Sequence, residues 1–349
     1  MALQHMEESK RIFLITDLKD DSPKSVRVER RRWLKGFIRL GHDVQWFSYD
    51  CMLRRFSFRH SRRLSRYFGR GKVDSLLVEQ VKHYRPHIVF VHCMGQITER
   101  TVSALRNVAP DAVFVGRDND LFQESDPVRL TVGGKMDIVV ATNAGRFLRT
   151  YKEAGAPLCA FVPNPCDPDI QRPYEVDNAW KSDIIFTGVA EHSKLERGID
   201  RYDLLLRLSK MPNVRLYGCF GNPTIDGIDC FYALSGANIA LSINTVNDVR
   251  LCHSDRLVNC LACGTFTLAK RVPDSNLLFQ DYVHLRYFDT ADEFFDLADY
   301  YLKNKNEREK IARAGMERAH TEFNCTKISQ YVLDLVERGT YDAPWAEIL

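Results

Sequence analysis

The chain has 349 residues, of which 45% are hydrophobic and 27% are charged. These proportions are typical of soluble globular enzymes, so they exclude low-complexity disorder, a collagen-like fibre and a coiled-coil rod. At about 100–200 residues per domain the length predicts two domains, and no apolar run approaches the ~18 residues of a membrane span. The opening MALQHM resembles a cloning leader, so we expect the native sequence to begin at Met6.

Charge is distributed unevenly along the chain. Residues 1–100 hold 21 Lys and Arg against 11 Asp and Glu, and the remaining residues hold 28 against 35, which the net charge of +3 conceals. This asymmetry indicates an anionic partner for one half of the protein. The 10 cysteines have scattered spacings, and a chain of this size needs no disulfide framework, so we expect a cytoplasmic protein with free thiols.

The N-terminal half alternates short apolar runs with helical patterns. Arg11–Thr16 predicts a strand, Ser25–Leu40 has its apolar residues at helical spacing, and Gly41 follows that helix as a C-cap. Further strands are predicted at Asp43–Ser48, His87–His92, Ala112–Arg117 and Asp137–Thr142. Strands that alternate with helices predict parallel β-α-β units and a doubly wound sheet.

Residues 163–182 interrupt this pattern with four prolines, which predicts a linker. Strands are predicted after it at Asp183–Thr187, Val214–Tyr217, Ala237–Ile243, Thr265–Ala269 and Val283–Tyr287. Helices are predicted at Tyr202–Ser209, Ser254–Cys263, Ala291–Lys303, Asn306–Phe323 and Thr326–Arg338. We therefore expect an N-terminal domain at 6–162, a C-terminal domain at 183–325, and a last helical segment, 326–349, that packs back on the N-terminal domain. Two α/β domains joined by a hinge predict a ligand site in the cleft between them.

The C-terminal half offers a phosphate site without a standard motif. No G-x-G-x-x-G, Walker A or H-E-x-x-H motif occurs in the chain. Gly188 follows the strand at 183–187, where a glycine lets a ligand approach the backbone closely. Ser254 or Asp255 is a candidate N-cap for the next helix, and Arg256 lies in its first turn. A cation at a helix N-terminus suits a diphosphate, and a surface salt bridge is the alternative for Arg256.

Two catalytic candidates follow strands of the N-terminal half. His92 ends its predicted strand, where open α/β sheets bind ligands, and a buried, hydrogen-bonded histidine is the alternative. Asp118-Asn119-Asp120 follows the next strand, and a D-x-D triplet can hold a divalent ion against a diphosphate. Such triplets also arise by chance, since Asp167-Pro168-Asp169 is a second one. We take His92 and Asp118 as the catalytic candidates.

Two further features suggest binding. Cys260 and Cys263 form a C-x-x-C that we interpret as core packing rather than a metal or redox site, because no second pair accompanies it. Residues 51–72 carry eight Lys and Arg and no acid, with aromatic residues between them. This composition suits an anionic membrane or a phosphate-rich acceptor and would also suit nucleic acid; a solvated connection is the alternative. Because no nucleic-acid recognition module is evident, we assign an acceptor or membrane surface to Arg59, Arg62, Arg63 and Arg66.

The C-terminal half contains segments of a known family. Residues 254–267, SDRLVNCLACGTFT, are similar to an S-x-R-x-F-E-x-x-A-C-G-x-F segment, and residues 288–323 are similar to the helical tail that follows it. DIIFTG, VRLYG and ANIALSIN are similar to strands of the same family. On these motifs residues 183–335 resemble glycosyltransferases of the GT-B fold, most closely the CgeB-like "group 1" subset. The N-terminal half resembles them in architecture only.

The resemblance implies two Rossmann-like domains facing a cleft, with a nucleotide-activated sugar on the C-terminal domain and the acceptor on the N-terminal one. It implies that Gly188 lies at the donor phosphates, that Arg256 and the amides near Ser254 bind the diphosphate, and that the loop after Gly218 meets the nucleobase. In the family's E-x7-E pattern the second Glu, expected to bond the ribose, is Asn259 here and the first is Leu251. The resemblance also implies that no metal is bound.

We therefore expect a metal-independent glycosyltransferase without a cofactor. It would move a sugar from a nucleotide-sugar, most readily a UDP-sugar, to a glycan, lipid-linked or protein acceptor. We expect it in the cytoplasm, with peripheral contact to the inner face of the membrane. A catalytically weak sugar-nucleotide-binding relative is the alternative, because Asn259 and Leu251 depart from the family pattern.

Overall fold

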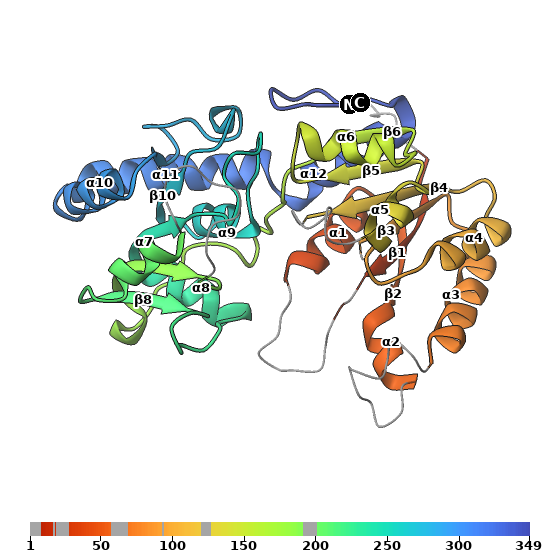
Figure 1. The fold of residues 1–349 in the computed structure, drawn as a ribbon, viewed down its shortest axis with the longest axis horizontal. Coiled ribbons are helices and arrows are strands. Elements are labelled where there is room, and N and C mark those ends of the chain that lie inside the picture. The colour runs from red at the N-terminus through yellow and green to blue at the C-terminus, as the bar shows by residue number, and fades with distance from the viewer. Residues whose placement is uncertain are drawn as a thin grey trace, which may run out of the picture.

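The computed structural model describes residues 8–16, 18, 28–56, 69–92, 94–119, 127–190 and 201–349. These residues form two α/β units side by side, each built on one parallel sheet (Figure 1). The predicted class, two doubly wound domains, is confirmed. The last strand of the first sheet, β6 (Leu158–Phe161), and the first strand of the second, β7 (Ser182–Thr187), are joined by the proline-containing stretch.

The N-terminal sheet has six parallel strands in the order β2-β1-β3-β4-β5-β6. Its strands are β1 (Arg11–Thr16), β2 (Asp43–Ser48), β3 (Ile88–Val91), β4 (Val113–Asp118), β5 (Ile138–Ala141) and β6 (Leu158–Phe161). The central strands β3 and β5 are buried along their whole length, because helices cover both faces of the sheet. The strand order reverses between β1 and β3, and ligands of open α/β sheets bind at the carboxyl side of such a switch point.

Six helices accompany these strands in the described residues. They are α1 (Val28–Arg39), α2 (Tyr49–Phe56), α3 (Arg70–Tyr84), α4 (Glu99–Val108), α5 (Pro127–Gly133) and α6 (Arg146–Glu153). Helix α1 packs its apolar side on the sheet: the rings of Trp33 and Phe37 lie 5.1 and 5.6 Å from the ring of Phe90, centroid to centroid. Helix α1 is therefore fixed against β3, close to the switch point.

The C-terminal sheet has five parallel strands in the order β11-β10-β9-β7-β8. Its strands are β7 (Ser182–Thr187), β8 (Val214–Tyr217), β9 (Ala237–Ser242), β10 (Phe266–Lys270) and β11 (Arg286–Phe288). Its helices are α7 (Arg201–Leu208), α8 (Gly227–Gly236), α9 (Asp255–Ala262), α10 (Ala291–Lys303) and α11 (Lys305–Glu322). The order reverses between β7 and β9, which gives this unit a switch point of its own.

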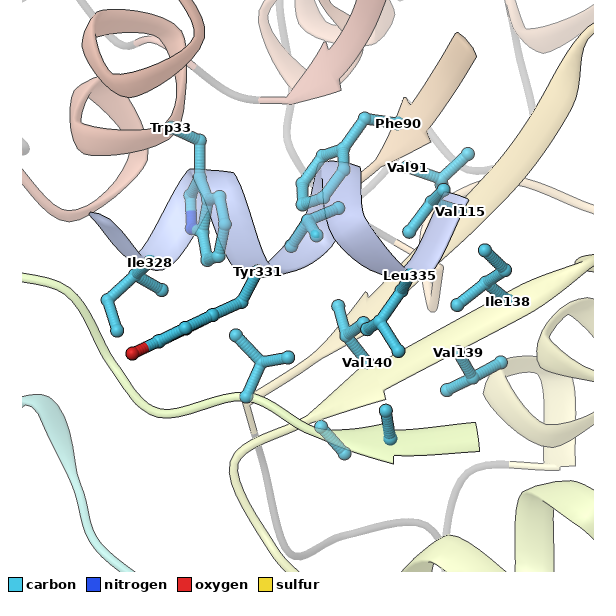
Figure 2. Close-up of a cluster of buried hydrophobic side chains, with 14 of the residues drawn as sticks. Trp33, Phe90, Val91, Val115, Ile138, Val139, Val140, Ile328, Tyr331 and Leu335 are labelled. Carbon is cyan, nitrogen blue, oxygen red and sulfur yellow. The ribbon is translucent and has the colours of Figure 1, made fainter. Parts of the chain in front are cut away.

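The chain then returns to the N-terminal unit. Helix α12 (Cys325–Arg338) crosses α1, and Figure 2 shows its Ile328, Tyr331 and Leu335 among strand residues of β3, β4 and β5. After α12 the backbone of Leu349 exchanges hydrogen bonds of 2.8 and 3.1 Å with Cys159. The C-terminal residues thus add an antiparallel pairing to β6, at the edge of the N-terminal sheet.

The stretch between the sheets is tied to α1 by charge. Lys35 donates to both carboxylate oxygens of Asp167 at 2.6 and 2.7 Å, and Asp169 pairs with Lys35 and Arg39. These two cations are four residues apart, so they lie on one side of the helix. The predicted linker is therefore held along α1, and the second D-x-D triplet has cationic side chains as its partners.

Candidate active site

A cavity of about 380 Å³ lies at the carboxyl ends of the C-terminal strands. Asn119, which follows β4, reaches it from the N-terminal unit, and Asn164 reaches it from the linker. Its other walls come from the ends of β7 and β8, the loop before α8, α8 itself and the first turns of α9. They are Thr187, Gly188, Tyr217, Thr224, Ile225, Asp226, Gly227, Cys230, Phe231, Ser254, Asp255, Arg256 and Asn259. The cavity is thus a cleft between the two units at the C-terminal switch point.

Arg256 is held at the centre of this switch point. Its Nε donates to the carbonyl of Thr187 at 2.5 Å and its Nη1 to the carbonyl of Ile243 at 2.9 Å, so it spans the ends of β7 and β9. Its guanidinium also stacks on the ring of Phe186, 4.5 Å from the centroid. These contacts use Nε and Nη1, and no described residue accepts a hydrogen bond from Nη2.

Gly188 brings the backbone against that guanidinium. Its φ of +145° lies in the region that favours glycine, and a Cβ built on it would lie 2.6 Å from Nη2 of Arg256. A side chain here would therefore occupy the space beside the cation. The glycine leaves this corner of the cavity open to a ligand.

The cavity is electropositive at this corner. Burial, together with the neighbouring Arg201, lowers the pKa of Arg256 to about 9, which still leaves the group charged at neutral pH. No carboxylate lies within ion-pairing distance of Arg256 in the part of the chain that the structure describes. Helix α9 begins at the cavity, and its N-cap residue Ser254 makes no side-chain cap bond. A cation and a helix N-terminus together favour a phosphate-like anion.

The opposite wall is the loop between β8 and α8. Thr224, Ile225 and Asp226 from this loop line the cavity. Gly218 does not, because it lies behind the wall, where its N–H donates to the carbonyl of Pro223 at 3.0 Å. Its positive φ of +86° lets it pass close to the carbonyl of Gly188. Gly218 therefore supports the loop from behind.

Residues 201–334 match the model of a glycosyl transferase-like family. Among solved structures, the chain resembles HepE of Anabaena in complex with UDP-glucose, with a TM-score of 0.59 at 12% identity over 94% of this chain and 99% of that one. It also resembles sucrose-phosphate synthase of Thermosynechococcus elongatus, with a TM-score of 0.59 at 15% identity over 94% and 98%. A third is AviGT4, a glycosyltransferase involved in avilamycin A biosynthesis, with a TM-score of 0.55 at 12% identity over 94% and 97%. No curated protein matches the chain.

Residues 201–334 thus match a glycosyl transferase-like family, and the chain as a whole has the GT-B fold of these structures. The family assignment made from residues 254–267 is thereby confirmed, although the comparisons do not single out the CgeB-like subset. Of the five residues predicted to bind the donor, the structure brings Gly188, Ser254, Arg256 and Asn259 to one cavity. Their individual roles stay predictions.

Neither of the two catalytic candidates is among the residues that line this cavity. His92 directly follows β3 at the N-terminal switch point, where its backbone N–H donates to the carbonyl of Ile15 at 2.9 Å. Asp118 is buried at the end of β4 and accepts bonds from Tyr151 at 2.6 Å and Arg129 at 3.0 Å. Those bonds give Asp118 a structural task. For both residues a part in catalysis stays a prediction.

Several other sequence-based predictions concern cysteines and charged residues. Cys260 and Cys263 are buried in an apolar cluster, and burial raises the pKa of the Cys260 thiol to about 12.

Asp120 lies outside the described residues, as do Arg59, Arg62, Arg63 and Arg66. Within the described ranges, no three His, Cys, Asp or Glu side chains gather in a way that could hold a metal ion. Nor does that part of the chain contain a helix with the length and apolarity to span a bilayer.

Sequence reasoning missed Arg32, which extends from α1 to two residues of the cavity wall. This side chain donates to Asn259 at 2.7 Å and forms an ion pair with Asp255 at 3.1 Å. It lies in a run of three arginines and is 223 residues from Asp255, so no local pattern marks it. Only its position next to Trp33, which lies on the apolar side of the helix, could have indicated that Arg32 is buried.

Proposed function

We propose that this glycosyltransferase takes its sugar from a nucleotide-sugar, most readily a UDP-sugar, without a bound metal. The observation that carries the proposal is the guanidinium of Arg256, placed between two strand ends beside Gly188 with no acid of the described residues paired to it. A nucleoside diphosphate supplies the missing negative charge. The complex of HepE with UDP-glucose supports the same class of donor for a protein of this fold.

The geometry suits departure of a diphosphate. Transfer breaks the bond between the anomeric carbon and the phosphate oxygen, and negative charge grows on that oxygen as the bond breaks. The Nη2 edge of Arg256 and the first turn of α9 face the space where this charge would develop, so they stabilise the transition state more than the ground state. They do for the leaving group what a divalent ion does in metal-dependent transferases.

We further propose that the acceptor, a glycan, lipid-linked or protein group, binds at the N-terminal switch point. His92 directly follows β3 there, at the carboxyl ends of the strands, where ligands of open α/β sheets bind. The basic residues 51–72 favour an anionic or lipid-linked acceptor. They also favour contact of a cytoplasmic protein with the inner face of the membrane. Co-sedimentation with anionic vesicles at low salt supports the lipid-linked class, and its absence favours a soluble acceptor.

The donor is tested by thermal shift with UDP, GDP, dTDP and CMP. A ligand at 100 times its Kd stabilises the folded state by about 2.7 kcal/mol, which raises Tm by several degrees. We expect UDP to give the largest shift, equal with and without EDTA. Arg256→Lys should abolish most of the shift, whereas the control Arg207→Lys, at an exposed ion pair with Asp292, should not. Equal shifts in all three proteins would overturn the proposal.

A catalytically weak relative that binds the nucleotide is the second candidate. Leu251, at the first acidic position of the family pattern, is fully buried in the core, and Asn259 at the second is neutral. Both changes remove charge that the family places near its donor. If UDP binds but neither transfer to any acceptor nor hydrolysis of a UDP-sugar is detected, this second function is supported instead.

A further inference from the structure

Helix α1 of the N-terminal unit reaches the donor cavity of the C-terminal unit through one side chain. Arg32 is 1% exposed, and its two terminal nitrogens take separate partners on α9. Nη1 pairs with Oδ1 of Asp255 at 3.1 Å and Nη2 donates to Oδ1 of Asn259 at 2.7 Å. The two partners are four residues apart, so they share one side of α9, and both line the cavity.

The hydrogen bonds around Asn259 fix which way its amide points. Arg32 can only donate, so the atom that it meets on Asn259 is the oxygen. The side-chain NH2 group of Gln171 donates to the same oxygen at 2.5 Å, and the side-chain carbonyl of Gln171 accepts the backbone N–H of Asp167 at 2.7 Å. With its oxygen taken twice, Asn259 has only its NH2 group left to offer. No described residue accepts a bond from that group.

Burial of Arg32 in this arrangement leaves one of its polar atoms without a hydrogen bond. Its Nε is buried and has no hydrogen-bond partner, and an unmade bond of a buried polar group is unfavourable. Nη1 additionally donates to the carbonyl of Pro165 at 2.6 Å, which fixes the guanidinium at the start of the linker. A planar fork can hold two oxygens at set positions, which the single ammonium of a lysine cannot. The fork geometry, rather than charge or packing alone, is what the site uses.

We propose that Arg32 is a positioning residue for the donor cavity. It holds the Asp255 carboxylate and the Asn259 amide so that one carboxylate oxygen and one NH2 group are presented together to the nucleotide-sugar. This inference rests on the proposed function, since it assumes that a nucleotide occupies the cavity. Its consequence is that affinity for the donor depends on a residue of the opposite unit, so donor binding is coupled to how the two units meet.

Calorimetric titration with UDP tests this in a double-mutant cycle of Arg32→Lys and Asn259→Ala. Each single variant should weaken binding about 10-fold, and the double variant should bind no more weakly than the worse single one, because both remove the same oriented amide. A residue that only supports the fold would change Tm without such coupling. The matched control is Arg39→Met, two turns along α1, which loses an exposed pair with Asp169 and should keep the affinity unchanged.

The outcomes separate the inference from the proposed function. Wild-type affinity in Arg32→Lys, or losses that simply multiply in the double variant, overturns the positioning role while the donor site stands. Failure of the wild type to bind any of the four nucleotides overturns the proposed function and this inference with it. If Arg32→Lys does not fold, Gln171→Met removes the other donor to Asn259 from the linker side. Weaker binding in that variant supports the fixed amide, and unchanged binding contradicts it.

Discussion

At the scale of single residues, Gly188 and Arg256 act as one unit. The glycine has a positive φ, and the absence of a Cβ leaves space beside the guanidinium of Arg256. A methyl group at this position meets Nη2 of Arg256 at 2.6 Å, and the bonds to Thr187 and Ile243 prevent that side chain from moving aside. Backbone strain of about 1–3 kcal/mol adds to the collision.

We therefore expect Gly188→Ala to reduce nucleotide affinity by at least about 10-fold, the equivalent of one charge-assisted hydrogen bond. Stability should fall by about 1–3 kcal/mol at the same time. Calorimetric titration with UDP and urea unfolding measure the two effects. Gly221→Ala is the comparison, because Gly221 also has a positive φ but nothing lies within 4 Å of its Cβ position. If both variants lose affinity equally, the space beside Arg256 is not the reason.

His253 makes the folded protein sensitive to acid. Burial lowers the pKa of this imidazole to about 4, well below its ordinary value of 6.5, although the bond to the carbonyl of Leu251 acts in the opposite direction. Its Nε2 accepts the backbone N–H of Asn164. Between pH 6.5 and pH 4, His253 is therefore protonated in the unfolded chain and neutral in the folded chain. Its contribution to stability is complete above pH 6.5 and is lost as the pH falls toward 4.

From these pKa values, unfolding by urea at pH 5 should show about 2 kcal/mol less stability from His253 than unfolding at pH 7.5. His253→Asn keeps a polar group near the Leu251 carbonyl without a titratable ring. Its stability difference between the two pH values should be smaller than that of the wild type by about this amount. An equal difference in both proteins would show that other groups carry the acid sensitivity.

At the scale of elements, the crossing of α1 and α12 depends on Gly36. A Cβ on Gly36 would collide with the Ser329 hydroxyl and with the backbone carbonyl of Cys325, both on α12. This glycine therefore lets the last helix lie directly on α1 (Figure 2). Since α1 also carries Arg32, the crossing fixes the helix that reaches the donor cavity.

Gly36→Ala should lower the free energy of unfolding by about 1–3 kcal/mol, the usual cost of overpacking. The matched control is Gly71→Ala in α3, where nothing lies within 4 Å of the added methyl group. There alanine should be neutral or stabilising by up to about 1 kcal/mol, because it favours helix more than glycine does. Urea unfolding of both variants measures the contrast, and equal effects would show that α12 does not press on Gly36.

The strands and helices also show which parts of the fold sequence patterns can predict. Strong periodicity predicted β2, β8 and α10 with the bounds that the structure has. The pattern missed β6, which has only four residues before a proline-containing stretch, and α8, which lies between glycines and has apolar residues on most sides. Local motifs identified Gly188, Ser254, Arg256 and Asn259, which line the cavity. They did not identify Arg32, because its partners on α9 are set by how two distant segments meet.

At the scale of the whole molecule, the C-terminal residues connect the two units. Glu347 lies beside the edge strand β6, where it accepts the backbone N–H of Gly145 at 2.6 Å and pairs with Arg250 of the C-terminal unit. The carbonyl of Arg250 in turn accepts the backbone N–H of Ala144 at 3.1 Å. The side chain of Arg32 makes a further polar contact between the two units.

Glu347→Ala should weaken the contact that Glu347 makes between the units, because it leaves the Gly145 N–H without its acceptor and Arg250 without one of its two carboxylates. The loss should be about 1–3 kcal/mol. Because the contact joins the units rather than supporting either core, we expect scanning calorimetry to show a broadened or divided transition instead of one shifted as a whole. The control Lys303→Ala removes an exposed pair with Asp299 inside α10 and should leave the transition unchanged. If UDP restores a single sharp transition in Glu347→Ala, nucleotide binding in the cleft couples the two units. A single unaltered transition in the variant without nucleotide would contradict the role of Glu347 in holding the units together.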